Sequence, residues 1–309
     1  MALAFFRQVR HAASRFVRDV YRAPVGRGTM SADVFLAVLA AAAMHASWNV
    51  LIKVRLDPFA SISLMSLGMA VMALPVLPLT TMPGGVTWAW MALSVVMHTG
   101  YKYFLARAYE TGDMAQSYPL ARGTAPLLAT LGALLLLGEA PGGLAVAGIL
   151  LLSAGTFLMS VRGGGLNALA GRTAAYALVT SVFIAGYTLA DGSGARSAAD
   201  GISYAAWLFL IEGVWSIIFC IMVRGRRIVR VMLPEWKIGL AAGSLSALGY
   251  GIVIWAMTNA PVAAVAALRE SSILFAMVLS VVVLGETLTR WRVAAALLIV
   301  AGVVALRLG

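Results

Sequence analysis

Charged side chains are scarce in this chain, since only 11% of its 309 residues are Asp, Glu, Lys or Arg. A soluble globular domain carries about 25% charged residues, and a disordered chain combines high charge with low hydrophobicity. Both classes are excluded, because 61% of the residues are hydrophobic and the mean hydropathy is +0.92.

Cysteine, histidine and the common enzyme motifs are also scarce or missing. Cys220 is the single cysteine and there are three histidines, which excludes a disulfide framework and a histidine-rich metal cluster. The sequence contains no HExxH pair, no P-loop, no dinucleotide fingerprint and no GxSxG elbow. We therefore predict no enzyme activity, no metal, no cofactor and no ATP-driven transport by this chain alone.

Long apolar runs are what the sequence has instead. Their length of about 20 residues suits helices that cross about 30 Å of hydrocarbon, whereas barrel strands are about 10 residues long and alternate. We therefore predict an all-α membrane protein with ten transmembrane helices. They cover residues 33–53, 58–79, 87–109, 114–137, 141–161, 172–191, 201–223, 237–258, 261–284 and 289–307. Turn residues such as Pro83-Gly84-Gly85 and Gly192-Ser193-Gly194 separate them.

An internal repeat relates the two halves of the chain. A shift of 147 residues brings Arg122 onto Arg269, and Leu137-Gly138-Glu139 onto Leu284-Gly285-Glu286. Because five helices per half is an odd number, the halves must cross the membrane in opposite directions. Two inverted five-helix repeats are typical of secondary transporters, whose substrate sites lie near the midplane between the repeats.

The repeat divides the chain into four predicted segments. These are a basic amphipathic tail at 1–30, a first repeat at 31–161, a linker at 162–171 and a second repeat at 172–309. The tail is either a helix on an anionic membrane surface or the product of a start codon upstream of Met30. We favour the second interpretation, or a dispensable tail.

The net charge of +11 does not indicate a nucleic-acid partner, because most cations lie in the tail, in short loops or at helix ends. The basic residues of the loops predict that both termini lie outside the cell. The arginines of the tail predict the reverse. The sequence therefore leaves the membrane orientation open.

Three cations, Lys102, Arg122 and Arg269, lie inside the apolar runs. Lipid cannot solvate a charge, so such residues face the interior of the helix bundle or a wet cavity. Arginine suits bidentate binding of a carboxylate or phosphate, and lysine supplies a point charge. We predict that Arg122 and Arg269 bind an acidic substrate group, with Lys102 assisting. The alternative is that buried acids neutralise these cations and the pairs fix the helix register.

Glu212, Glu270 and His98 are the predicted candidates for proton coupling. Desolvation favours the protonated form of a carboxyl group, which would let Glu212 load and release a proton. Both carboxylates could instead be structural partners of Lys102 or Arg269. For His98, a hydrogen-bonded packing role is the competing interpretation.

Polar and aromatic residues near these charges complete the predicted site. The candidates for substrate binding are His45, Trp48, Asn49, Tyr101, Tyr118 and Tyr250. Aromatic side chains can stack on a substrate, but they also fill the core of any helical membrane protein.

Several stretches resemble the EamA-type drug/metabolite transporter superfamily. Residues 45–53 (HASWNVLIK) resemble the first-helix signature of that family, and residues 118–126 (YPLARGTAP) resemble its fourth helix. The Leu-Gly-Glu sequences at 137–139 and 284–286 resemble the repeated end of each EamA unit. The resemblance covers residues 31–309 and implies a ten-helix inverted-repeat carrier with a central cavity. One departure is the loop between the second and third helices, which lacks the family's usual basic residues.

Members of that family move amino acids, other small metabolites and drugs, often outward. The resemblance therefore implies a secondary-active exporter of a small organic metabolite, such as an amino acid, organic acid or phosphonate, in the bacterial inner membrane. The predicted partners are an anionic or zwitterionic small molecule and membrane lipid. A flippase for an anionic lipid-linked headgroup and a membrane-embedded enzyme are the alternatives.

Overall fold

The computed structural model describes residues 30–52, 56–112, 114–160, 171–284 and 288–309. The predicted tail, nearly all of the predicted linker and the Gly285-Glu286 pair lie outside these residues. Between short connections the described chain is helical, and this part of the chain contains no strand.

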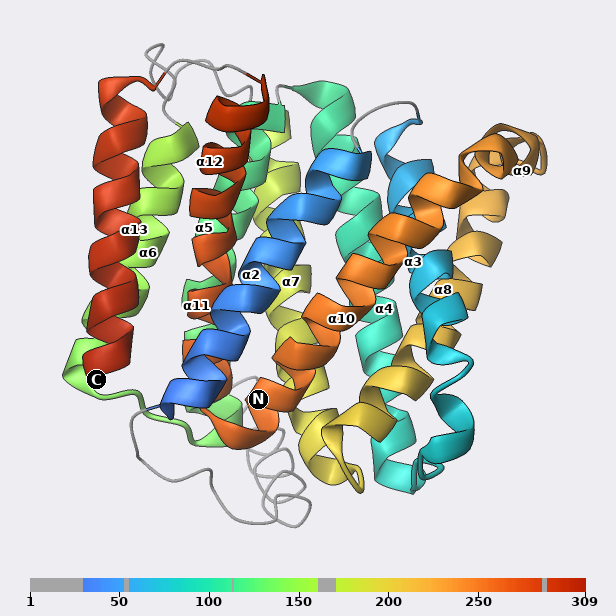
Figure 1. The fold of residues 1–309 in the computed structure, drawn as a ribbon, viewed down its shortest axis with the longest axis horizontal. Helices are drawn as coiled ribbons and strands as arrows, with labels where there is room; N and C mark the ends of the chain where they lie inside the picture. Colours follow the sequence, from blue (N-terminus) through green and yellow to red (C-terminus); the bar gives the residue numbers. More distant parts are fainter. Residues whose placement is uncertain (1–29, 53–55, 113, 161–170, 285–287) are drawn as a thin grey trace, which may run out of the picture.

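The described residues of the first half form five long helical segments (Figure 1). They are α2 (Ala32–Ile52), α3 (Pro58–Ala73), α4 (Gly85–Thr111), α5 (Met114–Gly132) with its π-helical continuation η2 (Ala133–Leu137), and α6 (Gly143–Ser160). The second predicted span, 58–79, is helical only to Ala73 before the short η1 (Leu77–Leu79). Pro75 and Pro78 explain this early end, because proline has no N–H group to continue the helix.

The second half repeats this arrangement. Its helices are α7 (Gly171–Ser197), α8 (Gly201–Arg224), α10 (Trp236–Asn259), α11 (Val262–Leu268) and α12 (Ser272–Leu284), joined by the 3-10 turn η5 (Arg269–Ser271), and α13 (Arg290–Leu308). The short α9 (Arg227–Met232) and η4 (Leu233–Glu235) connect α8 to α10. Arg269 therefore lies at an irregular turn, whereas Arg122 lies within the continuous helix α5.

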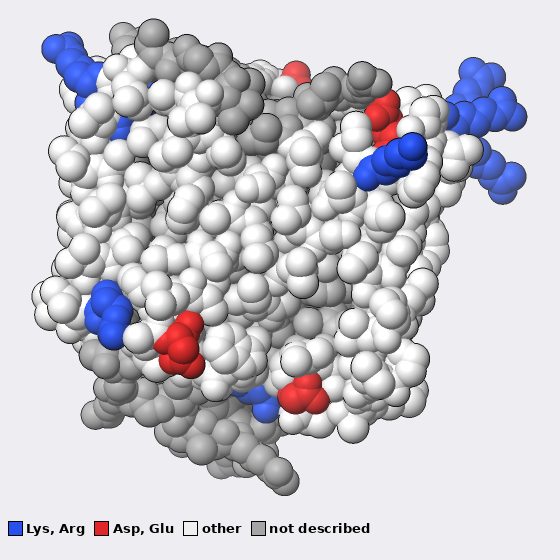
Figure 2. All heavy atoms as spheres, in the orientation of Figure 1, with Lys and Arg blue, Asp and Glu red and all other residues white. Residues whose placement is uncertain are grey.

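Among the residues that the structure describes, six helical segments are long and apolar enough, by length and composition, to cross a membrane. They are Ser117–Leu137, Gly171–Ser197, Gly201–Arg224, Arg227–Asn259, Val262–Val282 and Arg290–Leu308, and the shorter apolar helices are Pro58–Ala73 and Gly143–Met159. The remaining predicted spans, α2 and α4, carry polar side chains along their length, among them His45 and Lys102. On the face drawn in Figure 2, charged side chains gather toward the upper and lower edges, with an uncharged band between them. The chain is a multi-pass helical membrane protein.

The packing of the helices has a two-fold pattern. α3 packs against α8, and α6 against α13, so that equivalent helices of the two halves meet. The contact of α4 with α7 has its counterpart in that of α10 with α2, and the contact of α5 with α7 in that of α12 with α2. Exchanging the halves thus reproduces these principal contacts. In Figure 1, α2 rises from the lower edge and α7 descends toward it, so the halves are inverted.

One predicted boundary is wrong. Gly192-Ser193-Gly194 was expected to form a turn after residue 191, but α7 continues through it to Ser197. The glycines serve close packing, because a Cβ atom on Gly192 would meet the Val262 side chain at 2.6 Å, and one on Gly194 would meet the Tyr204 ring at 2.3 Å. As a result, Asp191 lies inside the molecule.

Candidate functional site

A cavity of about 70 Å³ lies between the two halves of the chain. Its walls come from α2, α3 and α4 of the first half and from α7, α8, α10 and η5 of the second. One ordered water needs about 10–15 Å³ of such volume, so the cavity has room for several waters or for a small organic molecule. Apolar side chains such as Met65 and Phe209 form part of the wall.

Most of the predicted site residues line this cavity. They are His45, Trp48, His98, Tyr101, Lys102, Glu212, Tyr250 and Arg269. The other predicted residues, Asn49, Tyr118, Arg122 and Glu270, are not among its lining residues, but several contact them. The Tyr118 hydroxyl lies 3.4 Å from His45 Nε2, and Asn49 Nδ2 donates to the His45 carbonyl at 2.7 Å.

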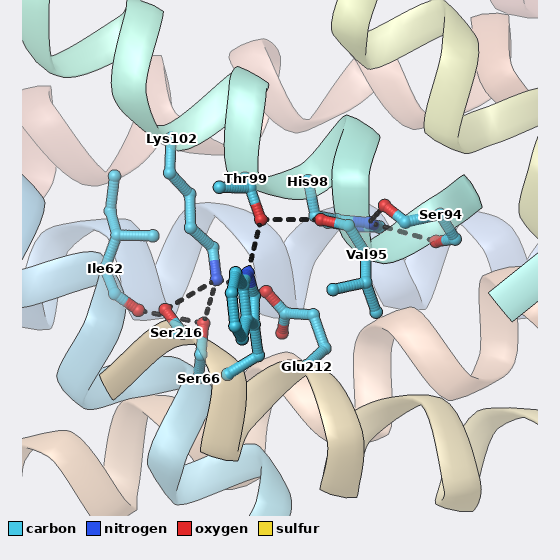
Figure 3. A network of polar contacts seen from close by, with 10 residues as sticks. Ile62, Ser66, Ser94, Val95, His98, Thr99, Lys102, Glu212 and Ser216 are labelled. Atoms are coloured by element: carbon cyan, nitrogen blue, oxygen red, sulfur yellow. Dashed lines mark hydrogen bonds and ion pairs between the residues drawn. The ribbon is translucent and has the colours of Figure 1, made fainter. Parts of the chain in front are cut away.

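Lys102 and Glu212 form a buried ion pair that joins the two halves (Figure 3). Their side chains are only 6% and 7% exposed. The Lys102 ammonium also donates to the hydroxyls of Ser66 on α3, at 2.8 Å, and Ser216 on α8, at 2.9 Å. An ammonium has three donors, and here all three have partners. In this conformation Lys102 is therefore neutralised by a buried acid, which is the alternative to substrate binding that the sequence left open.

His98 lies beside this network on α4. Its Nδ1 atom is 3.1 Å from both the hydroxyl and the carbonyl oxygen of Ser94, one turn earlier (Figure 3). Its ring stacks on that of Tyr187, with the ring centroids 4.1 Å apart. Next to it, Thr99 accepts a hydrogen bond from Trp215 Nε1 at 2.9 Å. His98 is thus held on one side by its own helix and on the other by α7.

Arg122 and Glu270 form a second buried ion pair across the halves. Arg122 Nε donates to Glu270 Oε2 at 3.0 Å, and both side chains are 4% exposed. In the first repeat the position equivalent to Glu270 is Gly123, so the two repeat-related arginines have different surroundings. Arg122 Nη2 is buried without a hydrogen-bond partner among the described residues.

Arg269 differs from the other two buried cations. Its guanidinium carbon lies 5.0 Å from the centroid of the Tyr250 ring, an attractive cation–π arrangement. It lines the cavity and makes no hydrogen bond or ion pair with the part of the chain that the structure describes. A guanidinium has five N–H donors in a fork that fits a carboxylate or a phosphate. Arg269 is therefore the cation best able to bind an acidic ligand in the cavity.

Asp191 is a buried acid that the sequence analysis missed. Its side chain on α7 is 0% exposed, and its carboxylate accepts hydrogen bonds from the hydroxyls of Tyr204, at 2.9 Å, and Tyr250. The following Gly-Ser-Gly sequence resembles a turn, which concealed this position. Tyr187 could have indicated it, because this tyrosine lies one helical turn earlier on the same face of the helix. Tyr187 lines the cavity.

Glu139 connects the halves away from the cavity. Its carboxylate accepts from the Val262 backbone N–H at 2.8 Å, at the start of α11, and from Arg196 Nη1 at 2.5 Å. Arg196 also donates to the carbonyls of Met257 and Ala260 at the end of α10. Glu139 belongs to the Leu-Gly-Glu sequence that resembles the end of an EamA unit, and its contacts stabilise the break between α10 and α11. The repeat-related Glu286 lies outside the described residues.

Comparison with known proteins agrees with this architecture. The sequence profile of the EamA-like transporter family matches residues 33–161 and 172–308, one match for each half. No curated protein matches the chain. A solved structure described as "Crystal structure of protein" superposes with a TM-score of 0.70, at 20% identity, over 89% of this chain and 95% of its own. That likeness supports the fold. The family match confirms the resemblance found in the sequence.

Proposed function

The chain belongs to the EamA-like transporter family, and on this premise we propose that it is a secondary-active carrier of a small organic anion or zwitterion. Amino acids, organic acids and phosphonates are the substrate classes, and export across the bacterial inner membrane is the proposed direction. Alternating access between two inverted repeats moves the substrate. The observation that carries the proposal is a cavity lined by both repeats, with the unpaired Arg269 in its wall.

All ten long helical segments cross the membrane in this proposal. α2 and α4 carry polar side chains that line the cavity, among them His45, His98 and Lys102. Polar groups within a membrane-spanning helix are rare and turn toward the protein interior or a wet cavity. The principal contacts between helices, which have counterparts when the halves are exchanged, support an inverted five-plus-five arrangement.

Arg269 binds the acidic group of the substrate in this proposal, and the aromatic side chains of Trp48, Tyr101 and Tyr250 enclose the remainder. His45 adds a polar contact on the α2 side of the cavity. Lys102 and Glu212 join the halves, and the exchange of their contacts accompanies the change between the two conformations. Arg122 acts indirectly, because it holds Glu270, the residue next to Arg269.

The proposal predicts the effect of replacing Arg269. Arg269→Gln removes the charge and leaves a shorter, polar side chain, so we expect ligand affinity to fall by at least tenfold, the loss of one charge-assisted hydrogen bond. Transport into or out of proteoliposomes should fall equally, with little change in the melting temperature. Arg230→Gln, which neutralises an exposed arginine of α9, is the matched control and should keep wild-type transport. Unchanged ligand binding in Arg269→Gln would contradict the assignment.

The ligand is found by a thermal-shift screen of the purified protein against amino acids, organic acids and phosphonates. A ligand that binds the folded state raises the melting temperature, by an amount that grows with the logarithm of one plus its free concentration divided by its Kd. The direction follows from loading the best ligand on one side of a proteoliposome with known protein orientation. Cell fractionation tests the inner-membrane location.

A further inference from the structure

The described part of the chain buries six charged side chains, and their formal charges cancel. The three cations are Lys102, Arg122 and Arg269, and the three acids are Asp191, Glu212 and Glu270. A net charge in a medium of low dielectric constant is costly, so a balance of this kind is expected where the protein replaces water. The cancellation makes the interior sensitive to any charge that a ligand brings.

Four of these six groups form the two direct ion pairs, Lys102 with Glu212 and Arg122 with Glu270. Asp191 and Arg269 remain, and they do not touch. Tyr250 lies between them, since its hydroxyl donates to the Asp191 carboxylate and the Arg269 guanidinium lies over its ring. Asp191 is therefore the one described buried acid without an ion pair, and Arg269 is the one described buried cation with neither an ion pair nor a hydrogen bond.

The surroundings of Asp191 come from three helices besides its own. Tyr204 on α8 and Tyr250 on α10 each donate to one of its two oxygens, which satisfies an ionised carboxylate. On α4, the side chains of His98 and Ser94 both lie near the Asp191 carboxylate, and His98 interacts with that carboxylate electrostatically. His98 also interacts electrostatically with Glu212, so it lies between the two acids.

We propose that Asp191 is a proton-binding site whose protonation accompanies the binding of an anion at Arg269. This inference rests on the proposed function. In the ligand-free protein, the positive charge of Arg269 balances the negative charge of Asp191. When an anion neutralises Arg269, the charge of Asp191 is no longer balanced. A proton taken up from the bulk solution then forms an O–H bond on one carboxyl oxygen, and the buried charge returns to zero. The same proton leaves when the anion leaves, so one proton moves with each negative charge.

The assignment differs from the candidates that the sequence suggested. Protonating Glu212 or Glu270 would break an ion pair and leave Lys102 or Arg122 as an uncompensated buried charge. Breaking a buried pair by removing one charge costs about 3–5 kcal/mol. Protonating Asp191 breaks no ion pair, because Asp191 has no cation as a direct partner. Geometry therefore favours Asp191 as the acid that exchanges protons, with Tyr250 relaying its state to the Arg269 side of the cavity.

The dependence of anion affinity on pH tests the proposal. The probes are acetate, which is anionic, and glycine, which carries no net charge, each titrated into the purified full-length protein. We expect acetate affinity to rise by up to about tenfold for each unit of pH decrease, because one proton is taken up per anion bound. Glycine affinity should stay constant, since a zwitterion leaves the buried charge unchanged.

Asp191→Asn imitates the protonated acid, so it should bind acetate with an affinity that no longer depends on pH. Asp33→Asn, which changes an exposed acid at the start of α2, is the matched control and should keep the wild-type dependence. Tyr250→Phe keeps the ring beneath Arg269 but removes one donor to the Asp191 carboxylate, so the pH dependence should move to higher pH. A wild-type slope in Asp191→Asn would overturn the proposal.

Infrared difference spectroscopy of the ligand-free protein supplies a second, independent measurement, and it serves also if Asp191→Asn lowers the yield of folded protein. As the pH falls, a carbonyl band of a protonated buried carboxyl group should appear in the wild type and shift in Tyr250→Phe. The same band should persist in Glu212→Gln. No such band, or one lost only in Glu212→Gln, would contradict the assignment.

The outcomes separate the two proposals. If the wild type binds acetate through Arg269 but without any pH dependence or proton uptake, the proposed function stands and the role of Asp191 is wrong. If neither probe nor any anion of the wider screen binds, the proposed function and the role of Asp191 both fail.

Discussion

The buried ion pairs of this protein join side chains from the two halves of the chain. Lys102 and Glu212 are 110 residues apart, and Arg122 and Glu270 are 148 residues apart. Each pair is charge-balanced and hydrogen-bonded, which is how charges persist away from water. Because both pairs cross between the repeats, they bear on how the halves fit together as well as on local stability.

The pair of Arg122 and Glu270 allows a double-mutant test at the residue scale. Arg122→Gln leaves Glu270 buried without its cation, so we expect a loss of about 3–5 kcal/mol of stability. The double variant Arg122→Gln with Glu270→Gln removes both charges and should recover most of that loss. Thermal or denaturant unfolding in detergent measures the change.

A double variant no more stable than Arg122→Gln would show that the two side chains do not act as a pair. A double variant with restored stability and reduced ligand affinity would indicate that the pair positions Arg269.

Close contact between helices, rather than burial of apolar surface from water, holds membrane helices together. α6 and α13 illustrate this, since they are equivalent helices of the two halves and pack against each other. A Cβ atom on Gly302 would lie 2.8 Å from the Gly148 carbonyl oxygen, and one on Gly148 would lie 2.9 Å from the Gly302 carbonyl oxygen. Glycine at both positions lets the two backbones approach.

Gly302→Ala therefore tests the α6–α13 contact at the scale of the element. The added methyl group must push the helices apart, and overpacking of this kind costs about 1–3 kcal/mol. Gly84→Ala, where an added Cβ atom meets nothing within 4 Å, is the control and should keep the wild-type melting temperature. Equal melting temperatures for both variants would mean that α6 and α13 are not packed this closely.

Charge is distributed unevenly between the two ends of the whole molecule. Figure 2 shows cations at its upper edge, around α9 and over the start of α13, on the side opposite the described termini. The described cations on that side are Arg107, Arg172, Arg224, Arg226, Arg227, Arg230, Lys237, Arg290 and Arg292. On the side of Met30 and Gly309 they are Arg196, which pairs with Glu139, and Arg307.

The positive-inside rule predicts that the α9 side faces the cytoplasm and that the described termini lie outside. In a Cys220→Ser background, Arg230→Cys should then react with a membrane-impermeant thiol reagent only from the cytoplasmic side. Gly84→Cys, on the connection between α3 and α4, should react only from the opposite side. Reversed labelling would refute this orientation. Comparing the full chain with a chain that begins at Met30 isolates the contribution of the tail arginines, which predict the reverse.

The sequence by itself determined the class of this protein, its repeat and the burial of its charged residues. Lipid cannot solvate a charge, so Lys102, Arg122, Arg269, Glu212 and Glu270 had to lie inside the bundle wherever their helices packed. The 147-residue shift followed from residues alone. These inferences depend on local composition and periodicity, which are properties of the chain before it folds.

Only the tertiary structure decided which buried charges meet. The choice of Glu212 for Lys102, and of Glu270 for Arg122, depends on contacts between helices that are far apart in the sequence. Asp191 became part of the site because Gly192 and Gly194 pack against Val262 and Tyr204 and continue α7, where the local sequence favoured a turn. Partner choice and helix continuation are settled by packing, which no short stretch of sequence contains.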